Sequence, residues 1–344
     1  MSGVSVVIPT YNRADLLRLT LQSVLGQTVA PLEVIVVDDG STDHTAQVCA
    51  EFGDFVQYLR QKNQRLPAAR NAGIRAARGE WIALCDSDDL WQPHKLEMQL
   101  AALNATGAAW SITDFGIIDP DGNRSADDTH GFRHAFPVFE EIDITPKMHF
   151  GRWLDEREIQ LGSDRIKIYT GDAFGMLFEG NIALPSTSTI SRVLLDKAGL
   201  FETTFRAEET EFFHRIAASG TVAIVMKPLT DYRVGHPSLI KGDATPFIQD
   251  ALRSLELAAA LRPTLSAKER SAFREGRRRL LLRLAYSRLS SLDRAGARQA
   301  LYEAWHEDPI LSPRSTAIMV ASLLPETALR GLHWAKRAMR NQLS

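Results

Sequence analysis

Residues 80–89 join a short run of apolar residues directly to a cluster of acids. The run at 82–85, Ile-Ala-Leu-Cys, has no polar alternation, as in a strand that is covered on both faces. Asp86, Asp88 and Asp89 follow at once, at the carboxyl end of this strand, where open α/β sheets bind their ligands. This segment therefore predicts a parallel sheet with an acidic site at one edge.

Three carboxylates this close repel one another unless water, hydrogen-bond donors or a cation screens them. Hard oxygen ligands favour Mg²⁺ or Mn²⁺, which one or two carboxylates commonly hold together with substrate phosphates. An acidic turn that caps a helix starting near Pro93 explains the same residues without a metal. Both interpretations stay open on this segment alone.

The first hundred residues alternate strands with helices. Strands are expected at 4–8, 32–37, 56–60 and 82–85, and helices at 14–27, up to about 52, and at 67–77. Gly40 allows a tight turn after the second strand, and Ser41, Thr42 or Asp43 can cap the following helix. This alternation predicts a parallel sheet with right-handed crossovers, a nucleotide-binding type of α/β domain.

Composition limits the function. A chain of 344 residues with net charge −2 has room for about two domains and gives no reason to expect nucleic acid as a partner. The two cysteines, Cys49 and Cys85, fall in a predicted helix and a predicted buried strand, so no disulfide is indicated. We find neither a basic leader nor a run of about 18 apolar residues, and expect a cytoplasmic protein without signal peptide or membrane span.

The middle of the chain is less regular. A strand is expected at 110–118, then a turn at 119–123, and loops and short strands over the site as far as about 178. Regular structure returns at 181–191 and in a helix at 192–199 that ends on glycine. His130, His134 and His149 match no usual metal-ligand spacing.

A second acidic cluster opens the helix expected near 208–216. Glu208, Glu209 and Glu211 crowd its first turn, where the helix dipole alone would stabilise them. Together with the acidic turn at 86–89 they suggest a division of labour. One cluster would hold a phosphorylated donor while the other supplies a base.

Four stretches closely resemble glycosyltransferase family 2 of the GT-A fold, in the family's order and spacing. They are Val-Ser-Val-Val-Ile-Pro-Thr-Tyr-Asn-Arg at 4–13, Val-Val-Asp-Asp-Gly-Ser-Thr-Asp at 36–43, Ala-Arg-Asn-Ala-Gly-Ile at 69–74 and Cys-Asp-Ser-Asp-Asp at 85–89. The resemblance extends over roughly 1–240. It implies a nucleotide-sugar-binding half at 1–115, an acceptor-binding and catalytic-base half at 116–240, and a separate helical region at 241–344.

The resemblance also implies roles for single residues. Those matching the family's nucleotide-binding positions are Pro9, Thr10, Tyr11, Asp39, Arg70 and Asp86. Among them, Tyr11 would stack on the base, Asp39 would accept a ring N–H, and Arg70 would lie near the ribose and phosphates. Asp88 and His236 would ligate Mn²⁺ or Mg²⁺, and Asp89 would support the turn.

The family's catalytic base lies in a Glu-Asp pair at the start of a helix, which maps onto Glu208 and Glu209. This chain has Glu at the second position, so its carboxylate extends one carbon–carbon bond further. Glu209 is the expected base, with Glu208 as the alternative. It would take the acceptor hydroxyl proton in a single displacement with inversion.

The region after 241 reads as helices at 247–261, 268–289, 297–306, 316–323 and 327–339. Residues 280–309 resemble one tetratricopeptide hairpin, with Ala300, Leu301 and Ala304 on its packing face. From residue 262 onward about sixteen Lys/Arg stand against about seven Asp/Glu. Basic residues in this region suggest peripheral contact with the inner face of the plasma membrane. A solvated face or a homodimer interface explains them equally. The residues are Arg277, Arg278, Arg279, Lys336, Arg337 and Arg340, together with Trp334.

The sequence thus predicts an inverting, metal-dependent glycosyltransferase. Its donor would be a nucleotide-diphosphate sugar, with UDP favoured, and its acceptor a glycan or a lipid-linked molecule in polysaccharide or surface glycan synthesis. One alternative is an inactive GT-A-like protein that binds sugar nucleotides or serves as a scaffold. A nucleotidyltransferase would show a glycine-rich phosphate loop, which Pro9-Thr10-Tyr11-Asn12 does not provide.

Overall fold

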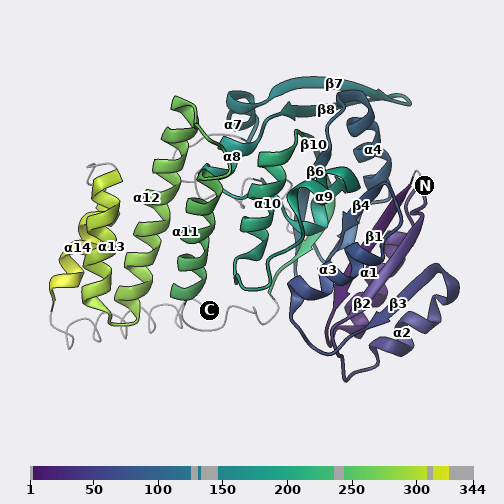
Figure 1. Ribbon diagram of the computed structural model, residues 1–344. Coiled ribbons are helices and arrows are strands. Elements are labelled where there is room, and N and C mark those ends of the chain that lie inside the picture. Colours follow the sequence, from purple (N-terminus) through teal and green to yellow (C-terminus); the bar gives the residue numbers. More distant parts are fainter. Residues whose placement is uncertain (1–2, 125–130, 133–145, 236–243, 308–312, 325–344) are drawn as a thin grey trace. The chain divides into compact units, whose positions relative to one another are not determined.

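The computed structural model describes residues 3–124, 131–132, 146–235, 244–307 and 313–324 (Figure 1). The chain divides into two compact units, Met1–Pro237 and Ser238–Ser344. The described strands all lie in the first unit, and the described elements of the second are helices. Within these ranges, no helix combines the length and the apolar character needed to cross a membrane.

Ten strands in the described part of the first unit form one mixed sheet. They are β1 (Val4–Thr10), β2 (Glu33–Asp38), β3 (Val56–Arg60), β4 (Trp81–Leu84), β5 (Leu90–Trp91), β6 (Trp110–Ile118), β7 (Asp155–Leu161), β8 (Asp164–Gly171), β9 (Ser188–Ser191) and β10 (Val222–Arg233). Their order is β3-β2-β1-β4-β9-β6-β10-β8-β7, and β5 pairs with β10. Strands β1 to β4 are mutually parallel, so their carboxyl ends share one edge of the sheet, as predicted.

Helices flank this sheet. They are α1 (Ala14–Leu25), α2 (Thr45–Glu51), α3 (Leu66–Ala76), α4 (Lys95–Thr106), α7 (Pro146–Trp153), α8 (Phe174–Glu179), α9 (Arg192–Ala198) and α10 (Glu208–Ser219). The turn before α2 uses Gly40 at φ 90°, and Asp43 accepts the backbone N–H of Thr45 at the start of the helix. Both features agree with the turn residues that the sequence predicted.

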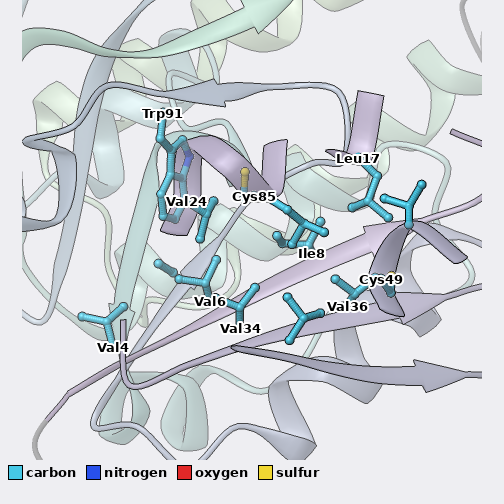
Figure 2. Close-up of a cluster of buried hydrophobic side chains, with 14 of the residues drawn as sticks. Val4, Val6, Ile8, Leu17, Val24, Val34, Val36, Cys49, Cys85 and Trp91 are labelled. Atoms are coloured by element: carbon cyan, nitrogen blue, oxygen red, sulfur yellow. The ribbon is translucent and has the colours of Figure 1, made fainter. Parts of the chain in front are cut away.

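Strand β1 is buried on both faces. Val4, Val6 and Ile8 pack on one face with side chains of α1 and β2 (Figure 2). On the other face lies α3, where a Cβ added to Gly73 would come within 2.3 Å of Cγ1 of Val7. Glycine at this position therefore permits the close approach of α3, and burial on both faces explains the continuous apolar run.

The described residues at 146–178 differ from expectation. Strands β7 and β8 form a regular antiparallel hairpin at the end of the sheet. Strand β8 pairs with the start of β10, at 222–225, whereas the end of β10 meets the acidic turn. The hairpin therefore does not fit the predicted loops and short strands over the site. Its edge strand carries Asp-Glu-Arg-Glu at 155–158, an exposed charged pattern that reads as a loop.

The second unit contains α11 (Thr245–Ala259), α12 (Ala267–Ser290), α13 (Arg294–Glu307) and α14 (Pro313–Leu323). Helices α12 and α13 form the predicted hairpin, and Ala300, Leu301 and Ala304 lie in its buried core with Leu281 and Leu284. The helix expected at 327–339 lies outside the described residues.

Two of the arginines considered for membrane contact form ion pairs within this unit. Arg277 lies 3.2 Å from Glu256 of α11 and 2.5 Å from Glu307 of α13, and Arg278 lies 2.9 Å from Glu275. Arg277 therefore joins three helices, which favours a structural role for its charge. Trp334, Lys336, Arg337 and Arg340 lie outside the described residues, so the membrane interpretation stays a prediction.

Candidate active site

Asp89 supports the acidic turn after β4. This residue is buried, and its carboxylate accepts the backbone N–H of Arg233 at 3.0 Å and the hydroxyl of Ser186. The hydroxyl oxygen of Ser186 also accepts the backbone N–H of Asp86 at 2.9 Å. Burial, with the charges of Asp88 and Asp86, raises the pKa of Asp89 well above its usual range. No sequence motif indicated Ser186, and the stretch 232–236 resembles one that follows the acceptor site in the family, without a role for Arg233 itself.

Arg233 holds the main chain of Asp88, and Arg13 pairs with its side chain. Its carbonyl oxygen accepts a hydrogen bond from Nε of Arg233 at 2.9 Å. Its carboxylate pairs with the guanidinium of Arg13, in the loop after β1. The side chain of Asp88 is 14% exposed and that of Arg13 is 31% exposed. Both side chains of this pair are therefore partly open to solvent.

The residues predicted to meet the nucleotide base lie together where β1 and β2 end. Pro9 pairs with Val37 in parallel register, and the backbone N–H of Asp39 donates to the carbonyl of Thr10 at 2.9 Å. Tyr11 follows, with 47% of its surface exposed. Its ring is therefore available for stacking at the carboxyl edge of the sheet.

Polar contacts fix the two loops at this edge. Oδ1 of Asp39 accepts the side-chain amide of Gln61 at 2.7 Å and the backbone N–H of Gln64 at 2.9 Å. Asn12 has φ 50°, a left-handed conformation that Asn tolerates well, and its Oδ1 accepts the backbone N–H of Thr42 at 2.7 Å. Gln61 and Gln64 follow β3 without a motif that would mark them.

The three acids in the first turn of α10 have different partners. Glu211 pairs with Arg215 one turn later at 2.6 Å, within its own helix. Glu208 and Glu209 instead face Arg70 of α3. Nη2 of Arg70 lies 2.9 Å from Oε1 of Glu209, and Nη1 lies 3.6 Å from Oε1 of Glu208.

Arg70 joins the two acidic clusters. Its side chain is fully buried, and its Nη2 also donates to both carboxylate oxygens of Asp86, at 2.8 and 3.0 Å. Its guanidinium lies over the ring of Phe201, with Cζ 5.2 Å from the ring centroid. The fold thus brings Asp86 and Glu209 to a single cation. The predicted contact of Arg70 with ribose and phosphates stays a prediction.

The environment of the two glutamates raises their pKa values. Burial is the main cause for both, and the charge of Arg70 partly offsets it. For Glu209, the nearby charges of Asp86 and Glu208 add to burial and bring the pKa to about 7. The side chain of Glu209 is 30% exposed against 11% for Glu208. A partly accessible carboxylate with a pKa near neutrality suits a general base.

The donor set also fits a divalent cation. Asp88 offers hard carboxylate oxygens at the edge of the sheet where a diphosphate is expected. In the described part of the chain, no three His, Cys, Asp or Glu side chains converge as they would in a closed metal site. Such a site suits a cation that one or two carboxylates and substrate phosphates hold together.

The histidines add little to this donor set. His236, the second predicted ligand, lies outside the described residues, as do His130 and His134. His149 is buried, with its Nδ1 3.3 Å from a carboxylate oxygen of Glu179.

The comparisons with known proteins agree with this geometry. The family model described as "Glycosyl transferase family 2" matches residues 5–181. An uncharacterized glycosyltransferase of Rickettsia bellii is 40% identical over 35% of this chain and 18% of its own length. The putative teichuronic acid biosynthesis glycosyltransferase TuaG of Bacillus subtilis is 37% identical over 35% of this chain and 49% of its own length. The chain therefore spans less than two thirds of these curated relatives.

Solved structures share the fold over most of the chain. S. aureus TarS 1-349 in complex with UDP-GlcNAc is 17% identical, with a TM-score of 0.61, over 92% of this chain and 84% of that one. The mannosyltransferase PcManGT from Pyrobaculum calidifontis, in complex with GDP-Man and Mn2+, is 19% identical, with a TM-score of 0.54, over 96% and 83%. The expected GT-A-type α/β fold with a helical C-terminal region is thus confirmed. Because the family model matches just over half of its residues, this chain belongs to glycosyltransferase family 2.

Proposed function

We propose that this protein is an inverting, metal-dependent glycosyltransferase that moves a sugar from a nucleotide-diphosphate donor to an acceptor hydroxyl. One observation carries the proposal. The buried Arg70 brings Asp86, at the donor edge of the sheet, and Glu209, at the start of α10, to a single guanidinium. Donor and acceptor chemistry can therefore meet at one place, although the two carboxylates are far apart in sequence.

On this proposal, the donor base stacks on the exposed ring of Tyr11 and hydrogen-bonds to Asp39. Asp86 contacts the ribose or the sugar. Asp88 would hold a divalent cation, which, when bound, would neutralise charge that develops on the leaving diphosphate. The exposure of Tyr11 and the position of Asp39 beside Thr10 support this arrangement.

Glu209 acts as the base in the transfer step. Its carboxylate takes the proton of the acceptor hydroxyl as the oxygen attacks the anomeric carbon. A new carbon–oxygen bond forms, the bond from that carbon to the diphosphate breaks, and the electron pair leaves with the diphosphate. A single displacement of this kind inverts the configuration of the anomeric carbon.

The comparisons support a proposal for the donor class and for the biosynthetic role. TarS was solved with UDP-GlcNAc and PcManGT with GDP-Man and Mn2+, and the name of TuaG refers to teichuronic acid biosynthesis. We propose a UDP-sugar donor, a glycan or lipid-linked acceptor, and a role in surface polysaccharide synthesis. Activity at the cytoplasmic face of the membrane, with peripheral attachment or dimerisation through the helical unit, is part of the same proposal.

Calorimetric titration tests the proposal directly. UDP, GDP, dTDP and CDP, then their sugar conjugates, are titrated into the protein with Mn²⁺, with Mg²⁺ or with chelator. We expect one nucleotide to bind tightly and only with metal. Absence of binding in a folded sample would overturn the donor site and favour an inactive scaffold.

A further inference from the structure

The Nη2 group of Arg70 is shared between two carboxylates. It has two N–H bonds but lies 2.8 and 3.0 Å from the oxygens of Asp86 and 2.9 Å from Oε1 of Glu209. Three acceptors therefore compete for two donors. Any weakening of the contact with Asp86 leaves more of this group for Glu209.

The remaining donors of Arg70 are poorly used. Within the described residues, its Nε and Nη1 are buried without a hydrogen-bond partner. Nη1 lies 3.6 Å from Glu208, close enough for an ion pair and too far for a hydrogen bond. Because an unsatisfied buried donor is costly, the cluster gains if a glutamate moves closer to the guanidinium.

The guanidinium itself has little freedom to move. It is fully buried against Phe201. The side chain of Asn71 bonds to the backbone oxygen and N–H of Phe201 at 2.8 and 2.9 Å, and the Phe201 ring stacks on Phe212 at 3.8 Å. Rearrangement is therefore expected in the carboxylates, which are partly exposed, rather than in the cation.

We propose that Arg70 is a positioning residue that couples the donor side of the site to the catalytic base. It holds the Glu209 carboxylate in place and ionised, and transfers to Glu209 the hydrogen bonds that Asp86 gives up on contacting the donor. This inference rests on the proposed function for its purpose, but the coupling is a property of the free protein. Glu209 becomes a ready base only when Asp86 is engaged elsewhere.

The charges around Glu209 determine whether loss of Arg70 raises or lowers the pKa of Glu209. Arg70 faces it from α3, Asp86 from the turn after β4, Glu208 from its own helix and Tyr232 from β10, and Arg65 acts on Glu208. Burial and the two carboxylates raise the pKa of Glu209, and Arg70 lowers it. Loss of Arg70 should therefore raise this pKa further and leave Glu209 protonated at neutral pH.

A ligand-free titration tests the coupling. Protein labelled with ¹³C at the glutamate carboxyl carbons is titrated by NMR, and the Glu209 signal is the one that Glu209→Gln removes. Arg70→Met should raise the Glu209 midpoint by at least about one pH unit, equivalent to about a tenfold lower fraction of ionised base below the midpoint. Arg75→Met, on the exposed face of the same helix, should leave it unchanged.

A double-mutant cycle separates coupling from simple charge removal. Asp86→Asn should lower the Glu209 midpoint in the wild-type background and clearly less in the Arg70→Met background. Equal shifts in both backgrounds, or an unchanged midpoint in Arg70→Met, would overturn the proposal. If Arg70→Met does not fold, Arg70→Lys replaces it, with a smaller rise expected because an ammonium lacks the planar fork. Since no substrate is used, failure of the proposed transfer reaction would leave this result interpretable.

Discussion

The two acidic clusters of this site are neutralised in different ways. In the turn after β4, Asp88 pairs with Arg13, while Asp89 is held by Ser186 and the backbone of Arg233. Each of these carboxylates has its own partner. At the start of α10, Glu208 and Glu209 depend on one arginine from another helix, which they share with Asp86.

The same contrast occurs within α10. Glu211 pairs with Arg215 within its own helix, and helix stability accounts for it. Glu209 obtains its cation only through the fold, shares it with a competitor, and has a pKa raised to about 7. An acid whose charge is incompletely compensated is the better candidate for chemistry.

The largest effect is expected from removing the base. Glu209→Gln should lower the rate of transfer by about 10²- to 10⁴-fold, the usual contribution of general base catalysis, with donor binding nearly intact. The measurements are steady-state transfer rates and calorimetric donor affinity. Glu211→Gln is the matched control in the same helical turn. It changes an acid of the same turn that pairs with Arg215 and not with Arg70, and should lower transfer far less than Glu209→Gln does. Full activity of Glu209→Gln, with loss in Glu208→Gln, would move the base to Glu208.

Stability should respond most at Asp89. Asp89→Ala leaves the buried N–H of Arg233 and hydroxyl of Ser186 without their acceptor, and we expect the free energy of unfolding to fall by about 2–4 kcal/mol. Urea denaturation of the purified protein measures it. Ser186→Ala removes one of these contacts together with the acceptor of the Asp86 N–H, but leaves the Arg233 N–H bonded to Asp89, and should cost less than Asp89→Ala. Equal losses in the two variants would show that Asp89 is not the support of the turn.

Local signals explain what the sequence predicts well. The strands expected at 56–60 and 110–118 have the observed bounds, because β-branched and aromatic runs between turn residues mark them. The acids themselves were identified because they follow strand ends or crowd a first turn. In both cases, the information lies within a few residues.

Partners that come from distant segments escaped prediction. Ser186 lies in a short turn before β9. Arg233 donates its backbone N–H to Asp89 and its Nε to the carbonyl of Asp88, and it lies 144 residues after Asp89. The sequence of the charged edge strand β7 suggests a loop, because an exposed strand lacks the alternation of apolar and polar residues that marks a half-buried one. The sequence therefore indicates which groups are charged, while the fold determines which of them share a partner.

A smaller change in affinity is expected at Asp88. Asp88→Ala should reduce metal-dependent donor affinity by at least about 10- to 100-fold, because loss of even an outer-shell partner of a metal ligand usually costs that much. Calorimetry with Mn²⁺ and with chelator would then give nearly the same dissociation constant for the variant. A variant that still binds donor more tightly with Mn²⁺ would exclude Asp88 as the ligand.

The smallest expected effect is a change in Mn²⁺ affinity when Arg13 is replaced. It shows whether Arg13 competes with the cation for Asp88 or holds Asp88 in position. Because a partly exposed ion pair contributes at most about 1 kcal/mol, Arg13→Gln should tighten Mn²⁺ binding to nucleotide-free protein by up to about fivefold. The electron paramagnetic resonance signal of free Mn²⁺ measures this directly. Arg18→Gln, which breaks an exposed pair with Glu51, is the control and should leave Mn²⁺ binding unchanged. Tighter binding would mean that Arg13 occupies the place of the cation until the metal arrives. Weaker binding would mean that Arg13 holds Asp88 in position for it, and the turn would then resemble the start of α10, where we propose that an arginine orients the catalytic base.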